Sequence, residues 1–202
     1  MPLGANKAAI MGVAGVSAGA DVVLLSSQTF SDSAGVAFTS GIDSTYGEYI
    51  FGFYNIKLET DDYQLAFQVN ASGESGYNET ITSTFFKAFH SEGDSTSFAY
   101  GTGSGDPSVQ SDQAQGTAYQ PLIEASGSAA DENSAGKLHL FNPSSTTYVK
   151  HFCSRLSSSE EGEGELDNFA AGYINTTAAI TGINFKSTSG AIDGTIKMWG
   201  VK

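Results

Sequence analysis

The chain has 202 residues and a net charge of −13, and only 15% of its residues are charged, against about 25% in typical soluble domains. Hydrophobic residues make up 40%, so a core can form, and 24 glycines among many Ser and Thr residues favour β-strands joined by turns. The 9 Lys and Arg residues stand one at a time against 22 acids. This pattern argues against binding to nucleic acid and to anionic membranes, because both need clustered cations.

Residues 1–20 differ from the rest of the chain because they are almost all small and apolar. They are too short and too rich in glycine to fold alone. We therefore expect an N-terminal anchor that docks on its own domain or on a partner chain through Leu3, Ala8, Ile10 and Met11. The segment does not read as a signal peptide. The G-x-S-x-G pattern at 15–19 is interpreted as a chance match, because a nucleophile elbow needs a strand and a helix around it.

Residues 21–202 show strand signals at short, regular spacing, and no segment has a sustained helical apolar stripe. Tyr63, Leu65, Phe67 and Val69 alternate with polar or small residues, which predicts a half-buried strand. The predicted strands are 22–25, 49–58, 63–69, 80–90, 138–141, 147–156, 169–174, 180–186 and 195–201. About nine strands over this length predict an all-β fold, a jelly-roll-like antiparallel β-sandwich with a short N-terminal extension.

The segments between these strands carry turn residues. Residues 70–76 and 187–194 are predicted to be hairpin connections, and Asp61-Asp62 a turn. The polar, glycine-rich segments 101–118 and 126–136 are predicted to be long loops, which in compact β-domains are usually functional, disordered or covered by a partner.

Few residues suggest catalysis or metal binding. His90, His139 and His151 lie in separate strand-like segments without metal-ligand spacing, and we interpret them as structural or surface residues. Cys153, the single cysteine, is predicted to be a small buried hydrophobe. The acidic run from Glu160 to Asp167 lacks the EF-hand pattern, so a solvated loop is the simpler interpretation, although weak cation binding stays open.

No acid stands in an apolar context that would raise its pKa, so the sequence gives no support for a glycoside hydrolase. We expect no catalytic residue, no cofactor and no metal site, and hence not an enzyme. Carbohydrate recognition is more plausible, because Tyr46, Tyr77, Tyr100 and Tyr119 fall in or beside loops, where aromatic rings can stack on sugars. The alternative is that these tyrosines close the edges of the sandwich.

Two parts of the chain resemble known proteins. The opening Pro2-Leu3-Gly4-Ala5-Asn6-Lys7-Ala8-Ala9-Ile10-Met11-Gly12 resembles the Gly/Ala leader of many virion structural proteins of marine and cyanobacterial tailed phages. Residues 174–185 followed by 189–201 resemble the final hairpin of phage appendage domains. Such proteins include tail fibres, baseplate or collar components and capsid decorations.

This resemblance implies a non-enzymatic virion component, assembled in the cytoplasm of the host bacterium, that forms a homotrimer or a ring. Residues 1–20 would bind other virion proteins, and a tail- or fibre-associated knob would contact a glycan or receptor on the host surface through Tyr100 and Tyr119. Neither nucleic acid nor membrane insertion is expected. Two alternatives stay open, a capsid decoration protein and a free carbohydrate-binding module or lectin.

Overall fold

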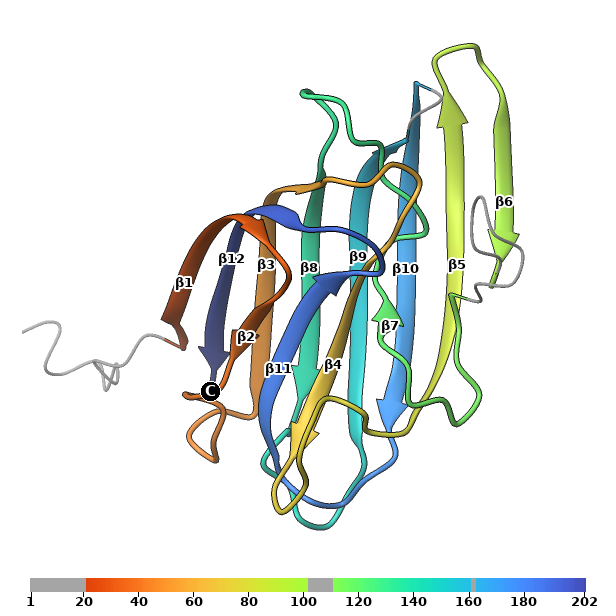
Figure 1. Cartoon of the computed structure of the whole chain (residues 1–202). Coiled ribbons are helices and arrows are strands. Elements are labelled where there is room, and N and C mark those ends of the chain that lie inside the picture. The colour runs from red at the N-terminus through yellow and green to blue at the C-terminus, as the bar shows by residue number, and fades with distance from the viewer. Residues whose placement is uncertain (1–20, 102–110, 161–162) are drawn as a thin grey trace, which may run out of the picture.

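The computed structural model describes residues 21–101, 111–160 and 163–202 (Figure 1). Within these residues the chain forms twelve strands and no helix that is long and apolar enough to cross a membrane. The strands are β1 (Val22–Ser33), β2 (Val36–Phe38), β3 (Glu48–Leu58), β4 (Leu65–Ala71), β5 (Ile81–Ser91), β6 (Thr96–Tyr100), β7 (Gln120–Pro121), β8 (Ser134–Phe141), β9 (Lys150–Glu160), β10 (Gly164–Ile174), β11 (Ile180–Ser187) and β12 (Ile192–Val201).

The strands form two antiparallel sheets that pack face to face. The large sheet has eight strands in the order β1-β12-β3-β8-β9-β10-β5-β6, and the small sheet has four in the order β2-β11-β4-β7. The small sheet lies over the middle of the large sheet (Figure 1). The two outermost strands of the large sheet are β1 and β6. The prediction of an all-β, jelly-roll-like antiparallel sandwich is confirmed for the described residues.

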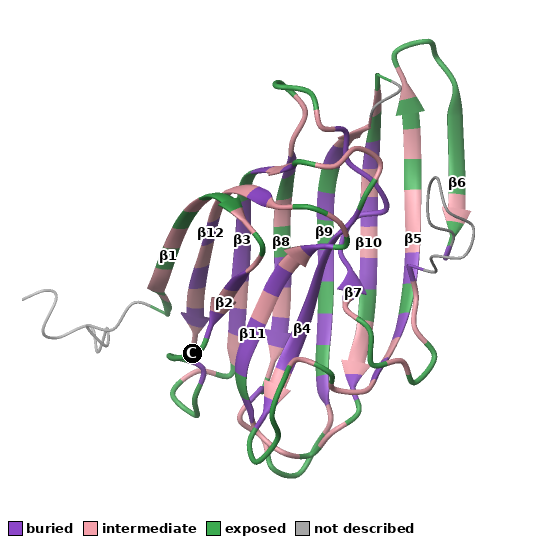
Figure 2. Cartoon of the chain, in the orientation of Figure 1, coloured by how far each residue is buried: buried purple, intermediate pink, exposed green. Residues whose placement is uncertain are grey.

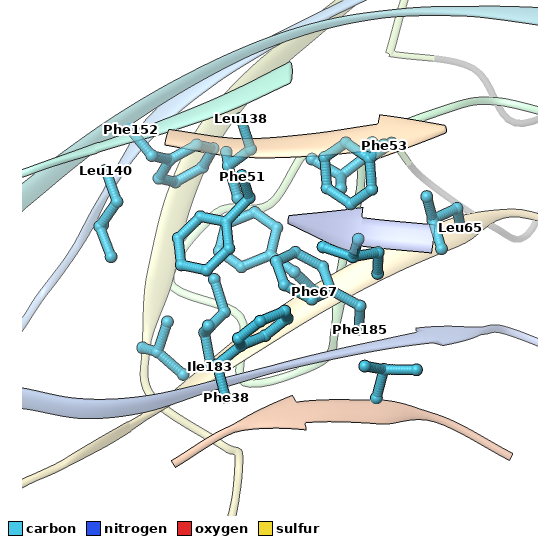
Figure 3. Packing of buried hydrophobic residues seen from close by; sticks show 14 of the residues in the cluster. Phe38, Phe51, Phe53, Leu65, Phe67, Leu138, Leu140, Phe152, Ile183 and Phe185 are labelled. Carbon is cyan, nitrogen blue, oxygen red and sulfur yellow. The ribbon is translucent and has the colours of Figure 1, made fainter. Parts of the chain in front are cut away.

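The core lies between the two sheets and is rich in phenylalanine (Figure 3). Phe67 of β4 meets Phe152 of β9 with ring centroids 5.0 Å apart and an interplanar angle of 81°. Phe185 of β11 meets Phe53 of β3 in the same edge-to-face manner at 5.2 Å. Such pairs contribute about 0.5–1.5 kcal/mol beyond the area they bury, so these rings fix how the two sheets sit on each other.

All nine predicted strands are present, most of them longer than predicted, and three short strands were missed. β2 has three residues and β7 has two, one of them Pro121, so neither is long enough for a periodic pattern. β6 is exposed along most of its length and pairs with β5 at the edge of the large sheet. An edge strand of this kind has no buried face that could select apolar residues.

The prediction of two hairpins is wrong. Residues 70–76 lead from β4 in the small sheet to β5 in the large sheet, and residues 187–194 lead from β11 in the small sheet into β12 in the large one. Gly73, Gly76 and Gly190 do have the positive φ angles of turns, at 87°, 96° and 73°. Turn residues specify that the chain reverses, but not which strand the next segment will pair with.

The segment 63–69 is not a half-buried strand. β4 begins at Leu65 and is buried on both faces, because Phe67 points into the core while Gln68 on the other face is covered by a loop. The Gln68 side-chain amide donates to the backbone oxygens of Glu79 (2.8 Å) and Ala118 (3.0 Å). The outer face of the small sheet is therefore partly covered at this strand.

Of the predicted loops, Asp61-Asp62 is confirmed as a turn, with Asp62 at φ 60°. The loop predicted at 126–136 ends earlier, because β8 begins at Ser134. Residues 102–110 of the loop predicted at 101–118 lie outside the described residues. Ser111, the first described residue after this gap, is buried. Its oxygen atoms accept hydrogen bonds from the side chains of Gln64 (3.1 Å) and Gln120 (2.8 Å).

A candidate binding surface on the large sheet

The face of the large sheet that points away from the small sheet is formed by alternate residues of long strands. Along β9, Phe152 and Leu156 are buried in the core, while Cys153 and Arg155 are exposed on the opposite face. Figure 2 shows this alternation as bands of purple and green along the strand. Successive side chains of a strand point to opposite faces, and residues paired across strands share a face. The register of the sheet therefore determines which outward side chains are neighbours.

One row of paired residues crosses seven strands from β12 to β6. Each member lies directly opposite the next, and the members in order are Lys197, Gly52, Lys137, Arg155, Phe169, Phe86 and Tyr100. We call these residues the cation–aromatic row. Three cations stand on one half of the row and three aromatic rings on the other half. At about 4.8 Å between strands, the row is about 29 Å long.

The aromatic half of the row ends at the edge of the sheet. Phe86 stacks on Phe169 with ring centroids 4.7 Å apart and an interplanar angle of 9°, and Phe98 lies 5.6 Å from Phe86 on its other side. Phe98 is 72% exposed and Tyr100 is 57% exposed. Contiguous exposed aromatic rings on a soluble protein mark interaction sites more often than isolated ones do.

The cationic half begins beside these rings. The Arg155 guanidinium lies 5.1 Å from the Phe169 ring centroid, and it donates from Nε (3.0 Å) and Nη2 (2.7 Å) to the Asp167 carboxylate. This hydrogen bonding raises the pKa of Arg155 above its usual value. Lys197 lies 5.1 Å from the Tyr54 ring centroid. Within the described residues, neither Lys137 nor Lys197 forms an ion pair with a carboxylate.

Trp199 lies next to the row, on the same face, and its position depends on Gly52. A Cβ atom added to Gly52 would stand 2.7 Å from Cζ3 of Trp199 and 3.2 Å from Cε2 of Tyr54. The absence of a side chain at Gly52 thus lets the indole ring lie close to the sheet, with its centroid 6.4 Å from that of Tyr54. The only tryptophan of the chain is therefore a natural reporter of events at this surface.

The structure does not bring the two predicted host-contact residues together. Tyr100 is at the exposed end of the row, whereas Tyr119 lies on the outer face of the small sheet. There its hydroxyl donates to Asn184 Oδ1 (3.0 Å), the ammonium of Lys186 lies 4.2 Å from its ring, and burial raises its pKa. Tyr46 and Tyr77 are half-buried, and Tyr46 packs edge-to-face on Tyr49. The predicted anchor residues Leu3, Ala8, Ile10 and Met11, and the pattern at 15–19, lie outside the described residues.

The three histidines all lie on strands, as predicted, and two of them are on the adjacent strands β8 and β9. His139 and His151 are on the outer face of the large sheet, where His139 pairs with Glu48, and His90 stands near the end of β5. Among the described residues, no group of three or more His, Cys, Asp and Glu side chains is arranged to hold a metal ion.

The prediction of a buried Cys153 is wrong. Cys153 is exposed, because the alternation of β9 points Phe152 and Ser154 inward and Cys153 outward. Partial desolvation, and to a smaller extent the nearby carboxylate of Glu48, raise the pKa of its thiol. The apolar neighbours of Cys153 in the sequence suggested burial. The face of the sheet on which a side chain lies, however, depends on its position in the alternation of the strand.

The expectation that no acid has an apolar environment is also wrong. Glu124 follows Leu122 and Ile123, all three are fully buried, and burial raises the pKa of the Glu124 carboxyl even though Lys87 pairs with it. Its backbone amide donates to Asn168 Oδ1 (2.9 Å). Glu124 lines neither the hollow beside Glu160 nor the hollow beside Tyr148. In this position it contacts Lys87 of β5, so the pair connects the segment after β7 to the large sheet.

The acidic run from Glu160 to Asp167 is mostly strand rather than loop, because β9 ends at Glu160 and β10 begins at Gly164. Asp167 pairs with Arg155 on the outer face. Glu160, Glu163 and Glu165 line an open hollow of about 770 Å³ together with Glu92, Asp94, Asp131 and Glu132. Carboxylates around an open hollow are what a highly acidic surface produces. In the described part of the chain, no group of three or more His, Cys, Asp and Glu side chains is arranged to hold a metal ion there.

Sequence reasoning missed the cations of the row. Lys137, Arg155 and Lys197 stand one at a time in the sequence, and the prediction treated them as scattered. Each occupies a position that alternates with buried residues on its strand, so the outward direction could have been inferred. Their alignment in one row depends on strand order and register, which no local pattern contained.

Comparisons with known proteins do not assign the chain to a family. No protein-family model matches it, and no curated protein matches it. A solved structure from Bacteroides ovatus, described as a protein of unknown function, aligns with a TM-score of 0.29 and 5% sequence identity, over 55% of this chain and 46% of that chain. The chain thus spans less than half the length of that protein. The class defined by the described residues is a two-sheet β-sandwich whose large sheet carries the cation–aromatic row on its outer face.

Proposed function

We propose that this chain is a non-enzymatic structural component of a bacteriophage virion, a tail- or fibre-associated knob anchored by residues 1–20. The resemblance of the leader and of the C-terminal segment to phage proteins suggests the class. The sandwich fold is compatible with it. The proposed location is the assembled virion, with other virion proteins as partners.

The observation that carries the proposal is that the two edges of the large sheet differ. Asp21, which follows the leader directly, lies at the start of edge strand β1, where its oxygen accepts a hydrogen bond from the Lys202 amide (3.0 Å). The opposite edge is β6, with the exposed Phe98 and Tyr100. Eight strands separate the edges by about 34 Å. An anchor at one edge would therefore leave the aromatic edge directed outward.

The direct test is immunogold labelling of purified virions with an antibody raised against residues 21–202. Label at the tail or its fibres is the expected result. Label spread over the head would instead identify a capsid decoration protein, the first alternative, and a high copy number per particle would accompany it. Virions without label would overturn the proposal and leave a free carbohydrate-binding module as the remaining alternative.

A second test removes residues 1–20. The shortened protein should keep its β-rich circular dichroism spectrum and its melting temperature, because the described core lies entirely within residues 36–198. It should fail to join particles, because the large apolar side chains of the leader would each contribute about 1.5–3 kcal/mol when buried on a partner. Normal incorporation of the shortened protein would show that the anchor lies elsewhere.

The expectation of a homotrimer or ring can be tested on the same protein by sedimentation equilibrium. Edge strand β1 is a site to examine for subunit contact, because Val22 and Leu24 are 51% and 52% exposed and an uncovered long edge strand is prone to pair with another chain.

A further inference from the structure

We propose that the cation–aromatic row binds an acidic polysaccharide, a chain of sugars that carries carboxylate or sulfate groups. Sugar rings would stack on the aromatic half at Phe86, Phe98 and Tyr100, and the acidic groups would pair with Arg155 and Lys137. This inference deepens the proposed contact with the host surface and rests on that function for its biological meaning. The binding itself can be tested with the purified chain alone.

The shape of the surface suits an extended chain. The row crosses seven strands in register over about 29 Å, and its exposed rings stand at one end of it. The row lies on the outer face of an extended sheet, and its members line neither the hollow beside Glu160 nor the hollow beside Tyr148. A chain of repeating units can make several weak contacts along such a line.

The aromatic half supplies the faces that sugars need. The Phe86 and Phe169 rings lie parallel, 4.7 Å apart between centroids and 9° from coplanar orientation, and Phe98 extends the cluster towards the edge of the sheet. The apolar C–H face of a sugar ring packs on such rings as other apolar groups do. The Asp167 carboxylate and the Arg155 guanidinium stand beside Phe169 as hydrogen-bond partners for hydroxyl groups.

The charge of the row argues for an acidic ligand. The whole chain has 9 Lys and Arg residues and a net charge of −13, yet three of these cations lie on this one line. Arg155 shares its charge with Asp167, but no hydrogen bond from its Nη1 is found among the described residues. Lys137 is exposed and lies directly opposite Arg155. Glu48, Glu165 and Asp167 lie on the same face, so the positive charge is confined to the line of the row itself. A line of this kind complements a sparsely charged anionic chain better than a dense one.

Nucleic acid fits this surface less well. Its affinity for proteins comes from many closely spaced cations that release counterions, and here only three cations stand beside a surface whose net charge would repel a dense polyanion. A polysaccharide with one acidic group per one or two sugars meets less repulsion and uses the aromatic half equally well. The test nevertheless includes a nucleic acid.

The experiment titrates the full chain with four polymers and follows Trp199 fluorescence and heat of binding. Dextran sulfate of low substitution, with about one sulfate group per two sugars, is the positive probe, because its sparse charge meets little repulsion from the acidic protein. Dextran has the same sugar backbone without charge. Polyacrylate carries charge without sugar rings, and oligothymidylate represents single-stranded nucleic acid. We expect dextran sulfate to bind more tightly than each of the other three. Equal binding of polyacrylate, tighter binding of oligothymidylate, or no binding of dextran sulfate would overturn the proposal.

Variants assign the binding to the row. Lys137→Gln should weaken the binding of dextran sulfate and make it less sensitive to salt, because one ionic contact is lost. Tyr100→Ala should weaken binding about tenfold, by analogy with aromatic rings that stack on bases. The matched control is Lys186→Gln, which removes an ammonium above a tyrosine ring on the small sheet and should change nothing. An equal effect of Lys186→Gln would place the site elsewhere and refute the inference.

Failure of this inference and failure of the proposed function are distinguishable. Labelled virions without dextran sulfate binding would leave the virion function standing and remove the glycan site. Row-dependent binding together with unlabelled virions would keep the site and turn the chain into a free carbohydrate-binding protein.

Discussion

The two faces of the large sheet are built from alternate residues of the same strands and differ in almost every respect. On the inner face Phe53, Leu138 and Phe152 are buried in a phenylalanine-rich core. On the outer face Lys137 and Cys153, their neighbours in the chain, are exposed. Packing alone explains the inner residues. Since packing places no such demand on the outer face, its line of cations and stacked rings calls for another cause, and ligand binding is the cause that we propose.

The inner face is not uniform either. Where the small sheet ends, the segment that follows β7 covers β9, β10 and β5 through polar contacts. Ser158 Oγ donates to the Ala125 oxygen (2.8 Å), and Asn168 Nδ2 donates to Ser158 Oγ (3.2 Å). Buried polar groups of this kind are stable only when they are paired. An irregular segment with free backbone groups can satisfy them, whereas an apolar strand face could not.

The sharpest test of the comparison uses two adjacent residues of β9. Phe152→Ala should lower the free energy of unfolding by about 3–5 kcal/mol, because it removes a buried ring that packs on Phe67 and leaves a cavity. Cys153→Ala, one residue away on the outer face, should change it by no more than about 0.5 kcal/mol. Urea denaturation followed by circular dichroism measures both.

The same cysteine gives an independent measure of which side is exposed. A thiol reagent should modify Cys153 in the folded protein at a rate that rises with pH, and slowly at neutral pH because the raised pKa keeps it protonated. Modification only after unfolding, or similar destabilisation by both alanine variants, would mean that β9 is shifted by one residue.

A smaller effect is expected at Gly52 on the outer face. Gly52→Ala should destabilise the protein by about 1 kcal/mol, near the low end for overpacking, because the indole of Trp199 can turn towards solvent. The fluorescence of Trp199 should shift to the red, and affinity for dextran sulfate should fall. Gly47→Ala is the control, because its added Cβ would meet no atom closer than 3.7 Å. Unchanged Trp199 emission in Gly52→Ala would contradict the arrangement described.

Local composition was sufficient to place several strands. The strands at 49–58 and 80–90 were predicted within one residue, because both segments are rich in aromatic and β-branched residues. The two predicted hairpins were wrong, because pairing depends on which faces are buried against each other. β11 and β12 are adjacent in the chain, yet each pairs with strands far away in the sequence.

Of the residues in the cation–aromatic row, only Tyr100 on edge strand β6 was predicted as a contact residue. Tyr100 was singled out because it stands beside a glycine-rich loop, which is a local signal. Arg155 and Phe169 are 14 residues apart and Lys137 and Arg155 are 18 apart, and only the antiparallel register places them opposite each other. A sequence pattern shows which side chains share a face within one strand. The neighbours in this surface lie on different strands, so strand order and register determine them.

The smallest of the three expected effects is a pH dependence at Glu124, on the polar part of the inner face. Burial raises the pKa of this carboxyl in the folded protein, and Lys87 opposes the shift. Below the ordinary pKa of glutamate both the folded and the unfolded chain hold the proton, so this group gives stability no pH dependence there. As the pH rises through the ordinary value the unfolded chain releases its proton first, so stability falls until the raised folded pKa is passed.

Urea denaturation at a series of pH values in the wild type and in Glu124→Gln measures this effect as a difference. Between the ordinary pKa of glutamate and the raised pKa of Glu124 in the folded protein, the wild type should lose stability relative to Glu124→Gln as the pH rises. Above the raised pKa the difference in stability should no longer change with pH. Lys87→Met removes the opposing ammonium, so the loss should grow and extend to higher pH. A wild type that instead gained on Glu124→Gln with rising pH would mean that Lys87 outweighs burial. The segment after β7 would then be held by a net-attractive ion pair, and the polar part of the inner face would be a source of stability rather than a tolerated cost.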